Sequence, residues 1–416
     1  MNNAADKQAG DKEHGGLQRT PLYTKMTILM YIIVFLYSGC FWIQIGVLPF
    51  LSKKLGVDPI MFGYLETIFS ISMLIGGPLF GRFGDLFGAR AALTLALFSA
   101  FLTYAMLAMS SNILMLFLSR LPGVLMHVMH GAQMVVTDVS GSAERVDVLG
   151  KLGVAYGVGM VTGPTVGGLI TRFSSEQTAA LAASIISLAT IVLVLATVPK
   201  TTKDPGRVAK TDEAKSESHS VFDYQAILAL LKIPMVRYIV ILKVVVGIPV
   251  GVFHSMFAMV NIDKFGLTAE TNGHLLSYVG IVTMVMQGFG VGYISKRFSD
   301  GSLLKMSTAA LAVSYLLLAL VDNLPFLLVI LIPMIASGSL LNLVASSSIT
   351  KCVPDTATGT SLGLSMATHS LIRTMTPTLG GYLYALFGYP SFGLLGFVMN
   401  GAMMISILMG YTGGIK

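Results

Sequence analysis

The stretch LGKLGVAYGVGMVTGPTVGG, residues 149–168, aligns without gaps on LGLSMATHSLIRTMTPTLGG, residues 362–381. Leu-Gly at the start, a proline (Pro164 and Pro377) and Gly-Gly at the end coincide in the two copies. Each copy is mostly apolar and about as long as the 20 or so helical residues that cross the hydrocarbon core of a bilayer. The repeat therefore predicts two similar halves built from membrane-spanning helices.

The composition supports a membrane protein. Of 416 residues, 54% are hydrophobic and 11% are charged, whereas a soluble domain carries about 25% charged residues. Apolar runs of spanning length occur at 27–50, 60–80, 91–110, 113–136, 150–170, 178–198, 238–260, 272–294, 303–321, 325–349, 361–386 and 390–412. We therefore expect an all-α membrane protein with twelve transmembrane helices in two pseudo-symmetric six-helix bundles.

A long polar segment separates the two sets of runs. It carries many charged residues after Pro199, and then Phe222, Ala226, Leu230 and Ile233 recur at helical spacing, which predicts an amphipathic helix on the membrane surface. The expected organisation is a tail (1–26), a six-helix bundle (27–198), a linker with this helix (199–237), a second bundle (238–412) and a tail (413–416).

The basic residues indicate the orientation. Of the 27 Lys and Arg residues, three lie within spans, four fall in the loops of one side, and the other twenty fall on the side of the termini and linker. This bias predicts that both termini and the linker are cytoplasmic, in the plasma membrane or an internal membrane such as the endoplasmic reticulum. The net charge of +7 therefore belongs to the loops and implies no nucleic acid. Cys40 and Cys352 lack metal-ligand or disulfide spacing, so neither a metal nor a cofactor is expected.

Two motifs carry a family resemblance. In GRFGDLFGAR, Gly81, Asp85, Gly88 and Arg90 match the Gly-x-x-x-Asp-x-x-Gly-x-Arg/Lys loop signature of the major facilitator superfamily. Gly159-x-x-x-Gly163-Pro164-x-x-Gly167-Gly168 matches the antiporter signature of that superfamily at every fixed position. The chain thus resembles drug:proton antiporters of the superfamily, and nearly all of it is also similar to the organic cation transporter-like branch of solute carrier family 22. It departs from family 22 proper in the short connection at 51–59.

The resemblance implies roles for both motifs. The loop would form a cytoplasmic gate, made of Gly81, Asp85, Gly88 and Arg90 with Asp138 as a partner acid; Leu86 replaces the usual arginine, and Lys296 stands where the second-half loop would carry an aspartate. The hinge would consist of Gly159, Gly163, Pro164, Gly167, Gly168, Pro377, Gly380 and Gly381. Proline bends a helix and small residues permit close helix contact.

Ionisable residues inside the spans are candidates for function, because a charge at membrane depth costs about 2.5 to 3.5 kcal/mol on insertion scales. The substrate or proton pathway is predicted to include Glu66, Arg120, His127, His130, Gln133, Lys243, His254, Gln287, Asn342, His369 and Arg373. Glu66 is the only acid deep in a predicted span and is the first candidate for proton transfer, with His127 and His130 second. Gln44 is a further neutral hydrogen-bonding candidate, and Phe41, Trp42, Phe253 and Tyr278 are candidates for an apolar wall.

Structural roles remain open for the same residues. Glu66 could simply pair with Arg120, the histidines could be packing residues, and Lys243 could reach the membrane interface with its ammonium group.

The function implied by the resemblance is exchange of a small organic solute, an organic cation or drug, for protons by alternating access. One acid against three buried cations equally allows anionic or neutral amphiphiles. A different class of function is a non-transporting membrane sensor or scaffold, for instance in lipid handling or protein turnover. Enzyme motifs such as a nucleophile or paired carboxylates are missing from the sequence. The expected partners are the solute, protons and membrane lipids, and the expected state is a monomer.

Overall fold

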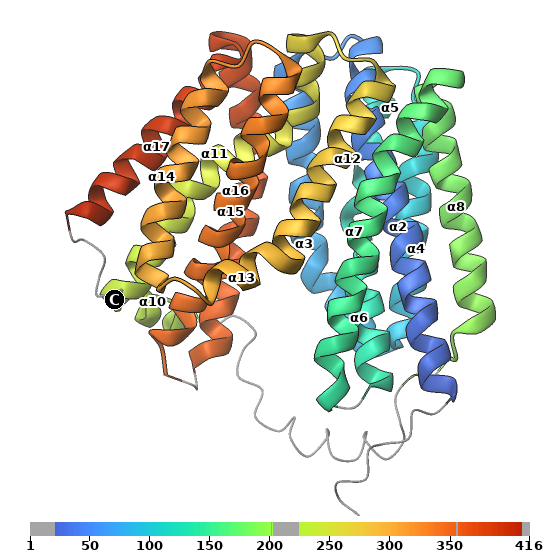
Figure 1. Cartoon of the computed structure of the whole chain (residues 1–416). Helices are drawn as coiled ribbons and strands as arrows, with labels where there is room; N and C mark the ends of the chain where they lie inside the picture. Colours follow the sequence, from blue (N-terminus) through green and yellow to red (C-terminus); the bar gives the residue numbers. More distant parts are fainter. Residues whose placement is uncertain (1–20, 141, 201, 203–223, 355–356, 410–416) are drawn as a thin grey trace, which may run out of the picture.

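The computed structural model describes residues 21–140, 142–200, 202, 224–354 and 357–409, and this part of the chain is helical without strands. The first half comprises α2 (Pro21–Lys54), α3 (Pro59–Phe87), α4 (Ala89–Ala108), α5 (Ile113–Leu118), η1 (Leu121–Leu125), α6 (Val128–Val139), α7 (Ser142–Phe173) and α8 (Glu176–Thr197). The second comprises α10 (Tyr224–Lys232), α11 (Pro234–Phe265), α12 (Ala269–Val285), η2 (Met286–Gly290), α13 (Val291–Ser295), α14 (Asp300–Ala319), α15 (Leu324–Lys351), α16 (Thr358–Phe387) and α17 (Pro390–Leu408). Figure 1 shows the two halves side by side.

Within these residues, eleven helices or helix combinations are long and apolar enough to cross a membrane. The twelfth, α16, has 30 residues and is not among the eleven, because serine, threonine, histidine and arginine interrupt its apolar surface. The expected twelve-helix, all-α membrane fold is confirmed. The predicted tails lie almost wholly outside the described residues, as does most of the linker, while α10 occupies the position of the predicted amphipathic helix.

Two spans are interrupted, where the sequence patterns predicted continuous helices. The fourth consists of α5, the 3-10 turn η1 and α6, because Pro122 lacks an amide hydrogen for the helical ladder. The break places Arg120 and His127 on either side of η1. The eighth span passes from α12 through the π-helical turn η2, which contains Gln287, into α13. Such turns frequently mark functional segments of helices.

The packing of the helices defines the interface between the halves. In the first half α2 packs on α7 and α4 on α8, and in the second α14 packs on α15 and α17. The halves meet mainly where α7 packs on α12 and where α3 packs on α16. We call the side of the bilayer on which α8 ends and α10 lies the linker side, and the opposite side the far side. Figure 1 shows the halves diverging toward the linker side.

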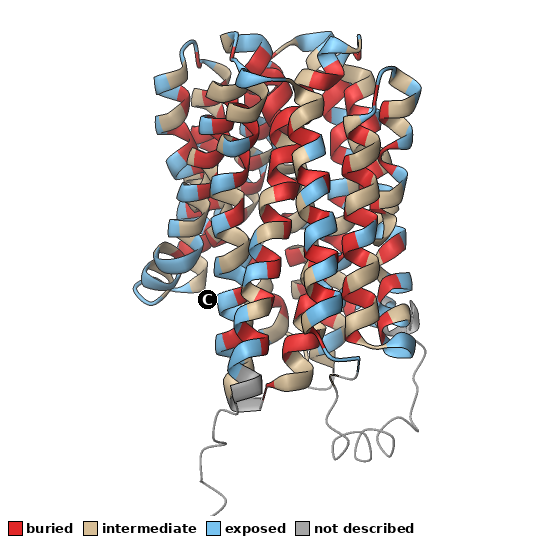
Figure 2. Ribbon diagram, turned by 90° about the vertical axis from the view of Figure 1, so that its right-hand side faces the viewer, coloured by how far each residue is buried: buried red, intermediate tan, exposed pale blue. Residues whose placement is uncertain are grey.

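The outer surface is apolar, as contact with lipid requires. Exposed residues line the outside of the bundle over its whole height in Figure 2, around a buried interior. On α8, for example, Leu181, Ile185, Leu188, Val192 and Leu195 are exposed.

The reversal between α3 and α4 needs glycine. Gly88 has φ +84°, a left-handed conformation that costs other residues energy, and its amide donates to the carbonyl of Gly84 at 2.9 Å. Gly88 of the loop signature therefore makes the tight reversal between α3 and α4 possible.

Candidate transport pathway between the two halves

Four glycines let the halves approach to backbone contact near the far side. A side-chain carbon at Gly63 of α3 would lie 2.5 Å from the carbonyl oxygen of Pro377 in α16, and one at Gly273 of α12 would clash with the carbonyl oxygen of Pro164 in α7. Reciprocally, carbons at Gly168 and Gly381 would lie 2.5 Å and 2.6 Å from the carbonyl oxygens of Ala269 and Pro59. We call these four the pivot contacts; they obey the pseudo-symmetry of the two halves.

Hydroxyl groups pair beside the pivot contacts. Thr67 and Thr378 share a hydrogen bond of 2.8 Å between α3 and α16. Thr165 and Ser277 share one of the same length between α7 and α12. Each pair lies one helical turn from a pivot glycine, so both interfaces follow the same pattern.

Ion pairs close the far side above these contacts. Arg172 at the end of α7 donates to both carboxylate oxygens of Glu270 in α12 at 2.8 Å. Lys53 of α2 forms an ion pair with Asp263 of α11. Charges at the ends of four helices therefore join the halves on the far side.

Toward the linker side the same four helices lose contact. At four glycines on this side, a side-chain carbon would meet no atom of another helix within 4 Å. They are Gly150 and Gly153 of α7 and Gly359 and Gly363 of α16. Gly288, just beyond α12, is equally open. The structure is therefore closed on the far side and open between the halves on the linker side.

Glu66 lies on α3 next to the hydroxyl pair of Thr67. Two guanidinium groups act electrostatically on its carboxyl: that of Arg120 in its own half and that of Arg373 in the other half. Neither forms an ion pair with Glu66 among the described residues. The carboxyl therefore interacts electrostatically with a guanidinium of each half but is not held by an ion pair to either one.

The Arg120 guanidinium is buried with few partners. The residue is 0% exposed, and its guanidinium carbon lies 5.7 Å from the centre of the Phe69 ring. Its Nε donates to the Ser119 hydroxyl at 3.3 Å, whereas Nη1 and Nη2 have no hydrogen-bond partner in the structure. Glu66 acts on this guanidinium through space, without a hydrogen bond or ion pair between the two among the described residues.

Arg373 occupies the middle of the interface. It is exposed on α16, and its charge acts on Tyr37 and Tyr156 of the first half and on His254 and His369 of the second. The structure thus brings Arg373 within electrostatic reach of Glu66, His254 and His369.

The remaining polar candidates differ in exposure. His127 is buried and His130 is exposed, with ring centres 5.5 Å apart. Gln287 and Asn342 are exposed on η2 and α15, and Gln133 is half-buried on α6. The neutral candidates are therefore distributed over both halves.

Lys243 is held inside the second half, contrary to the alternative in which it reaches the interface. Its ammonium group donates to Ser346 of α15 at 3.0 Å and to Ser365 of α16 at 2.5 Å.

The predicted apolar wall is mostly core. Phe41 and Trp42 are buried in the first half and Phe253 in the second, while the Tyr278 hydroxyl donates to the Leu328 carbonyl at 2.8 Å. Gln44 is also buried, with its Oε1 unpartnered.

The hinge residues divide between two interfaces. Carbons at Gly159, Gly163 and Gly167 would all press on α2 within the same half, whereas Gly168 meets α12. Carbons at Gly380 and Gly381 would meet α11 and the start of α3, respectively. Gly159, Gly163 and Gly167 of the antiporter signature therefore fix α7 to α2, whereas Gly168 and the carbonyl of Pro164 take part in the contact between the halves.

Among the described residues, no hydrogen bond or ion pair joins two of the predicted gate residues. Arg90 donates to the carbonyl of Leu195 at 2.6 Å. Asp138 accepts a hydrogen bond from Thr202, just after α8. Gly81 has open space where a side chain would be, and Asp85 is exposed.

Comparison with known sequences decides the family. The sequence profile of the Major Facilitator Superfamily matches residues 30–324 and 239–412, which together span nearly the whole chain. The chain belongs to the major facilitator superfamily. It is therefore a multi-pass integral membrane protein of a family whose members carry small solutes.

Three relatives within the superfamily indicate the branch. The chain is 39% identical to human "Solute carrier family 67 member A1" over 388 residues, covering 92% of this chain and 91% of the relative. It is 39% identical to "Solute carrier family 22 member 18" of Mus musculus, covering 90% and 93%. It is 26% identical to "Tetracycline resistance protein, class B" of Escherichia coli, covering 63% and 64%.

Solved superfamily structures share the fold at low identity. The nucleoside transporter NupG has a TM-score of 0.74 at 16% identity, with 93% of this chain and 98% of that chain covered. The human organic anion transporter MFSD10 has a TM-score of 0.62 at 16% identity, with 94% and 100% covered. These two structures therefore share the fold of this chain, and the family match is what indicates transport rather than catalysis.

The hydroxyl pairs and the glycines Gly63 and Gly273 at the contacts between the halves were not predicted from the sequence. Gly63 with Thr67, and Gly273 with Ser277, repeat the same four-residue spacing in the two halves. Their partners Thr165 and Thr378 each directly follow the aligned proline. Extending the repeat to the second and eighth spans would have found these residues, although not which helices they join.

Proposed function

We propose that this protein exchanges a small organic solute for protons by alternating between the far-side-closed state described here and a state closed on the linker side. The observation that carries the proposal is the position of Glu66, the acidic residue that lies deepest within a described helix. It adjoins an interhelical contact between the halves and is acted on by Arg373 from across that interface.

This position gives a physical route for coupling. A proton can shift a conformational equilibrium only if its binding group interacts differently in the two states. Movement of the halves changes the distance between the carboxyl of Glu66 and the guanidinium of Arg373, while Arg120 moves with Glu66. Protonation of the carboxyl removes the attraction to Arg373 and thereby favours the state in which these two groups lie farther apart.

The antiport direction is supported by the complete antiporter signature and by the tetracycline resistance relative. The charge of the solute follows a different argument. Arg120, Lys243 and Arg373 outnumber the single carboxylate of Glu66 in the spans, and the hydroxyls that hold Lys243 leave its charge uncompensated. An anionic or neutral amphiphile therefore fits the interface on electrostatic grounds, whereas relatives of family 22 suggest an organic cation.

Transport by the purified full chain in proteoliposomes tests the coupling. We expect an imposed pH gradient to drive solute accumulation by the unmodified protein. Glu66→Gln should retain binding and solute exchange but lose the pH-driven accumulation. Glu176→Gln is the matched control, since Glu176 lies in the same half but pairs with Lys54 at the far-side end of α8.

Two outcomes would oppose the proposal. Normal pH-driven accumulation by Glu66→Gln would remove Glu66 from coupling and direct attention to His127 and His130. Competition of uptake by matched cationic and anionic amphiphiles decides the charge class, and stronger inhibition by the cationic member would favour the family-implied substrate.

A further inference from the structure

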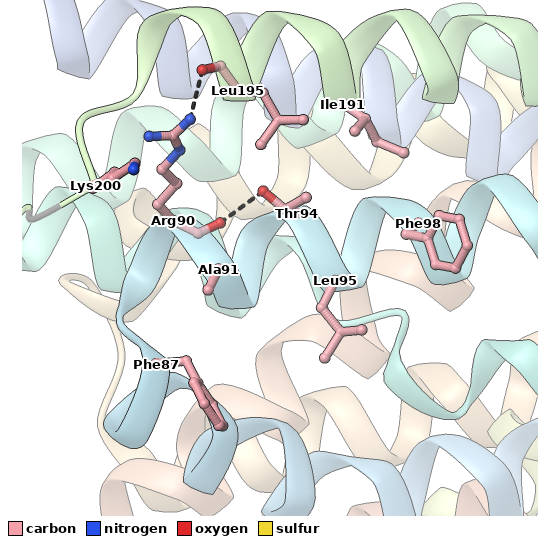
Figure 3. Close-up of a pocket in the computed structure, with 9 residues that line it drawn as sticks. All are labelled: Phe87, Arg90, Ala91, Thr94, Leu95, Phe98, Ile191, Leu195 and Lys200. Carbon is pink, nitrogen blue, oxygen red and sulfur yellow. Dashed lines mark hydrogen bonds between the residues drawn. The ribbon is translucent and has the colours of Figure 1, made fainter.

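A pocket of about 610 Å³ lies outside the interface between the halves, between the peripheral helices α4 and α8. Its wall is apolar over most of its extent, with Phe87, Leu95, Phe98 and Ile191 among the lining residues. Two cations, Arg90 and Lys200, lie together at one end, as Figure 3 shows. The pocket is thus divided into a cationic end and an apolar end.

The order of these two ends matches the order of a bilayer. Arg90 is the second residue of α4, at the linker-side end of that span, and Lys200 follows the end of α8. Phe98 lies eight residues further along α4, about 12 Å deeper at 1.5 Å per helical residue. Phe98 is 46% exposed, so the apolar end is open at the level of the acyl chains.

The cationic end has unused binding capacity. Arg90 spends one nitrogen, Nη2, on the carbonyl of Leu195 at 2.6 Å, which orients the guanidinium between the two helices. Neither Arg90 nor Lys200 forms an ion pair with a described residue. Thr94 lies one turn further along α4, and its hydroxyl donates to the Arg90 carbonyl at 2.9 Å. This hydroxyl hydrogen is therefore already used within the helix.

We propose that this pocket binds an anionic phospholipid, with the phosphate between Arg90 and Lys200 and an acyl chain along α4 toward Phe98. Basic pockets between transmembrane helices at the interfacial level suit anionic head groups, and arginine offers several donors to phosphate oxygens. A soluble phosphate ester would use the cations but not the 12 Å or so of apolar wall that continues into the hydrocarbon layer. A bound lipid would join the beginning of α4 to the beginning of the linker.

Native mass spectrometry of the full chain in detergent tests the site, with dioleoylphosphatidylglycerol and dioleoylphosphatidylcholine as probes. We expect the anionic lipid to bind more tightly. Lys200→Gln and Arg90→Gln should each weaken its binding about five-fold, the factor equivalent to about 1 kcal/mol per basic residue at an anionic surface. Binding of phosphatidylcholine should be unchanged.

Two further variants separate the site from general surface charge. Lys305→Gln removes an exposed cation from α14 in the other half and should leave lipid binding unchanged. Ala91→Trp keeps every charge but fills the pocket, so it should abolish tight binding; a melting curve confirms that the variant is folded.

The site is overturned if the Arg90→Gln, Lys200→Gln double variant binds the anionic lipid as well as the unmodified chain does, or if Lys305→Gln weakens binding equally. Glycerol 3-phosphate serves as the soluble competitor. Displacement of the lipid by this compound at comparable concentration would show that the cations recognise a free phosphate, and would contradict the lipid assignment.

Discussion

The carbonyl group of Pro164 in α7 lies against Gly273 in α12, at a distance that leaves no room for a side chain. Pro377 and Gly63 repeat the arrangement on the other side of the interface. Since a proline inside a helix removes one backbone hydrogen bond, α7 and α16 each carry a weakened point where they contact the other half. The pivot contacts therefore combine a weakened helix with the closest possible approach of its neighbour.

Gly63→Ala and Gly273→Ala should impair closure of the far side. Overpacking of a tight contact costs about 1 to 3 kcal/mol, so the equilibrium between the two states should shift roughly 5-fold to 150-fold and solute flux should fall. Gly338→Ala on α15 is the control, because a side-chain carbon there meets nothing within 4 Å. Flux equal to that of the control in both variants would show that the pivot contacts do not limit turnover.

Gly163→Leu should act differently, by destabilising the first half. A carbon at this position would lie 2.5 Å from the carbonyl oxygen of Gly39 and 2.9 Å from the Cβ of Trp42, both on α2. We expect a melting temperature several degrees lower and loss of binding together with flux. A stable variant that binds solute but does not transport it would instead place Gly163 in the conformational change.

The far-side ion pairs should influence the conformational equilibrium more than the overall stability. Arg172 is 58% exposed in its pair with Glu270, and exposed pairs contribute at most about 1 kcal/mol. Glu270→Gln combined with Asp263→Asn should thus barely change the melting temperature but should increase opening on the far side.

This opening can be followed by thiol labelling of Leu276→Cys, a buried position, in a Cys40→Ser, Cys352→Ser background. High salt should likewise increase labelling at this position in the protein that keeps both ion pairs, because dissolved ions screen exposed charges. Labelling that is independent of both the substitutions and the salt would contradict a role for these pairs.

Glu66→Gln should remain folded, because Glu66 and Arg120 do not form a direct ion pair. We expect melting curves between pH 5.5 and 8 to give an interaction energy below about 1 kcal/mol in the cycle with Arg120→Gln. A large loss of stability in Glu66→Gln that the double variant restores would identify the two residues as a structural pair.

The distribution of basic residues predicts that the linker is cytoplasmic. An epitope inserted between Pro205 and Gly206 should be hidden from antibody in intact cells and reached once the plasma membrane alone is permeabilised, with organelle membranes left sealed. Recognition of the epitope in the lumen or outside intact cells would reverse the predicted topology.

The sequence predicted the helices better than their interruptions. Apolar length identifies a span because the bilayer fixes how many helical residues are needed. It does not register a break such as that between Leu118 and Val128, where the chain stays apolar while the ladder is lost. Pro122 and Gly123 carried that signal, but a proline within a span also fits a bent continuous helix, as Pro164 shows.

For the candidate site, sequence patterns predicted the residue types but not their neighbours. Glu66 and Arg373 were singled out because charge is rare in a membrane, yet their mutual influence depends on α3 packing against α16. The sequence pattern was wrong about Phe41, Trp42 and Phe253, which were predicted to line an apolar wall and lie in the core instead. Aromatic side chains suit a binding wall and a packed core equally, so only the fold could assign them to the core.

Two hydroxyl pairs, Thr67–Thr378 and Thr165–Ser277, join the halves near the far side through hydrogen bonds that water can replace. Such bonds contribute only about 0.5 to 1.5 kcal/mol net, since each hydroxyl can bond to water instead. Glycine meeting a carbonyl likewise buries little hydrocarbon that would have to be rehydrated on separation. The contact between the halves on the far side can therefore open as water replaces its hydrogen bonds and close again as water leaves. The lipid-facing surface and the core of each half remain out of contact with water in both states.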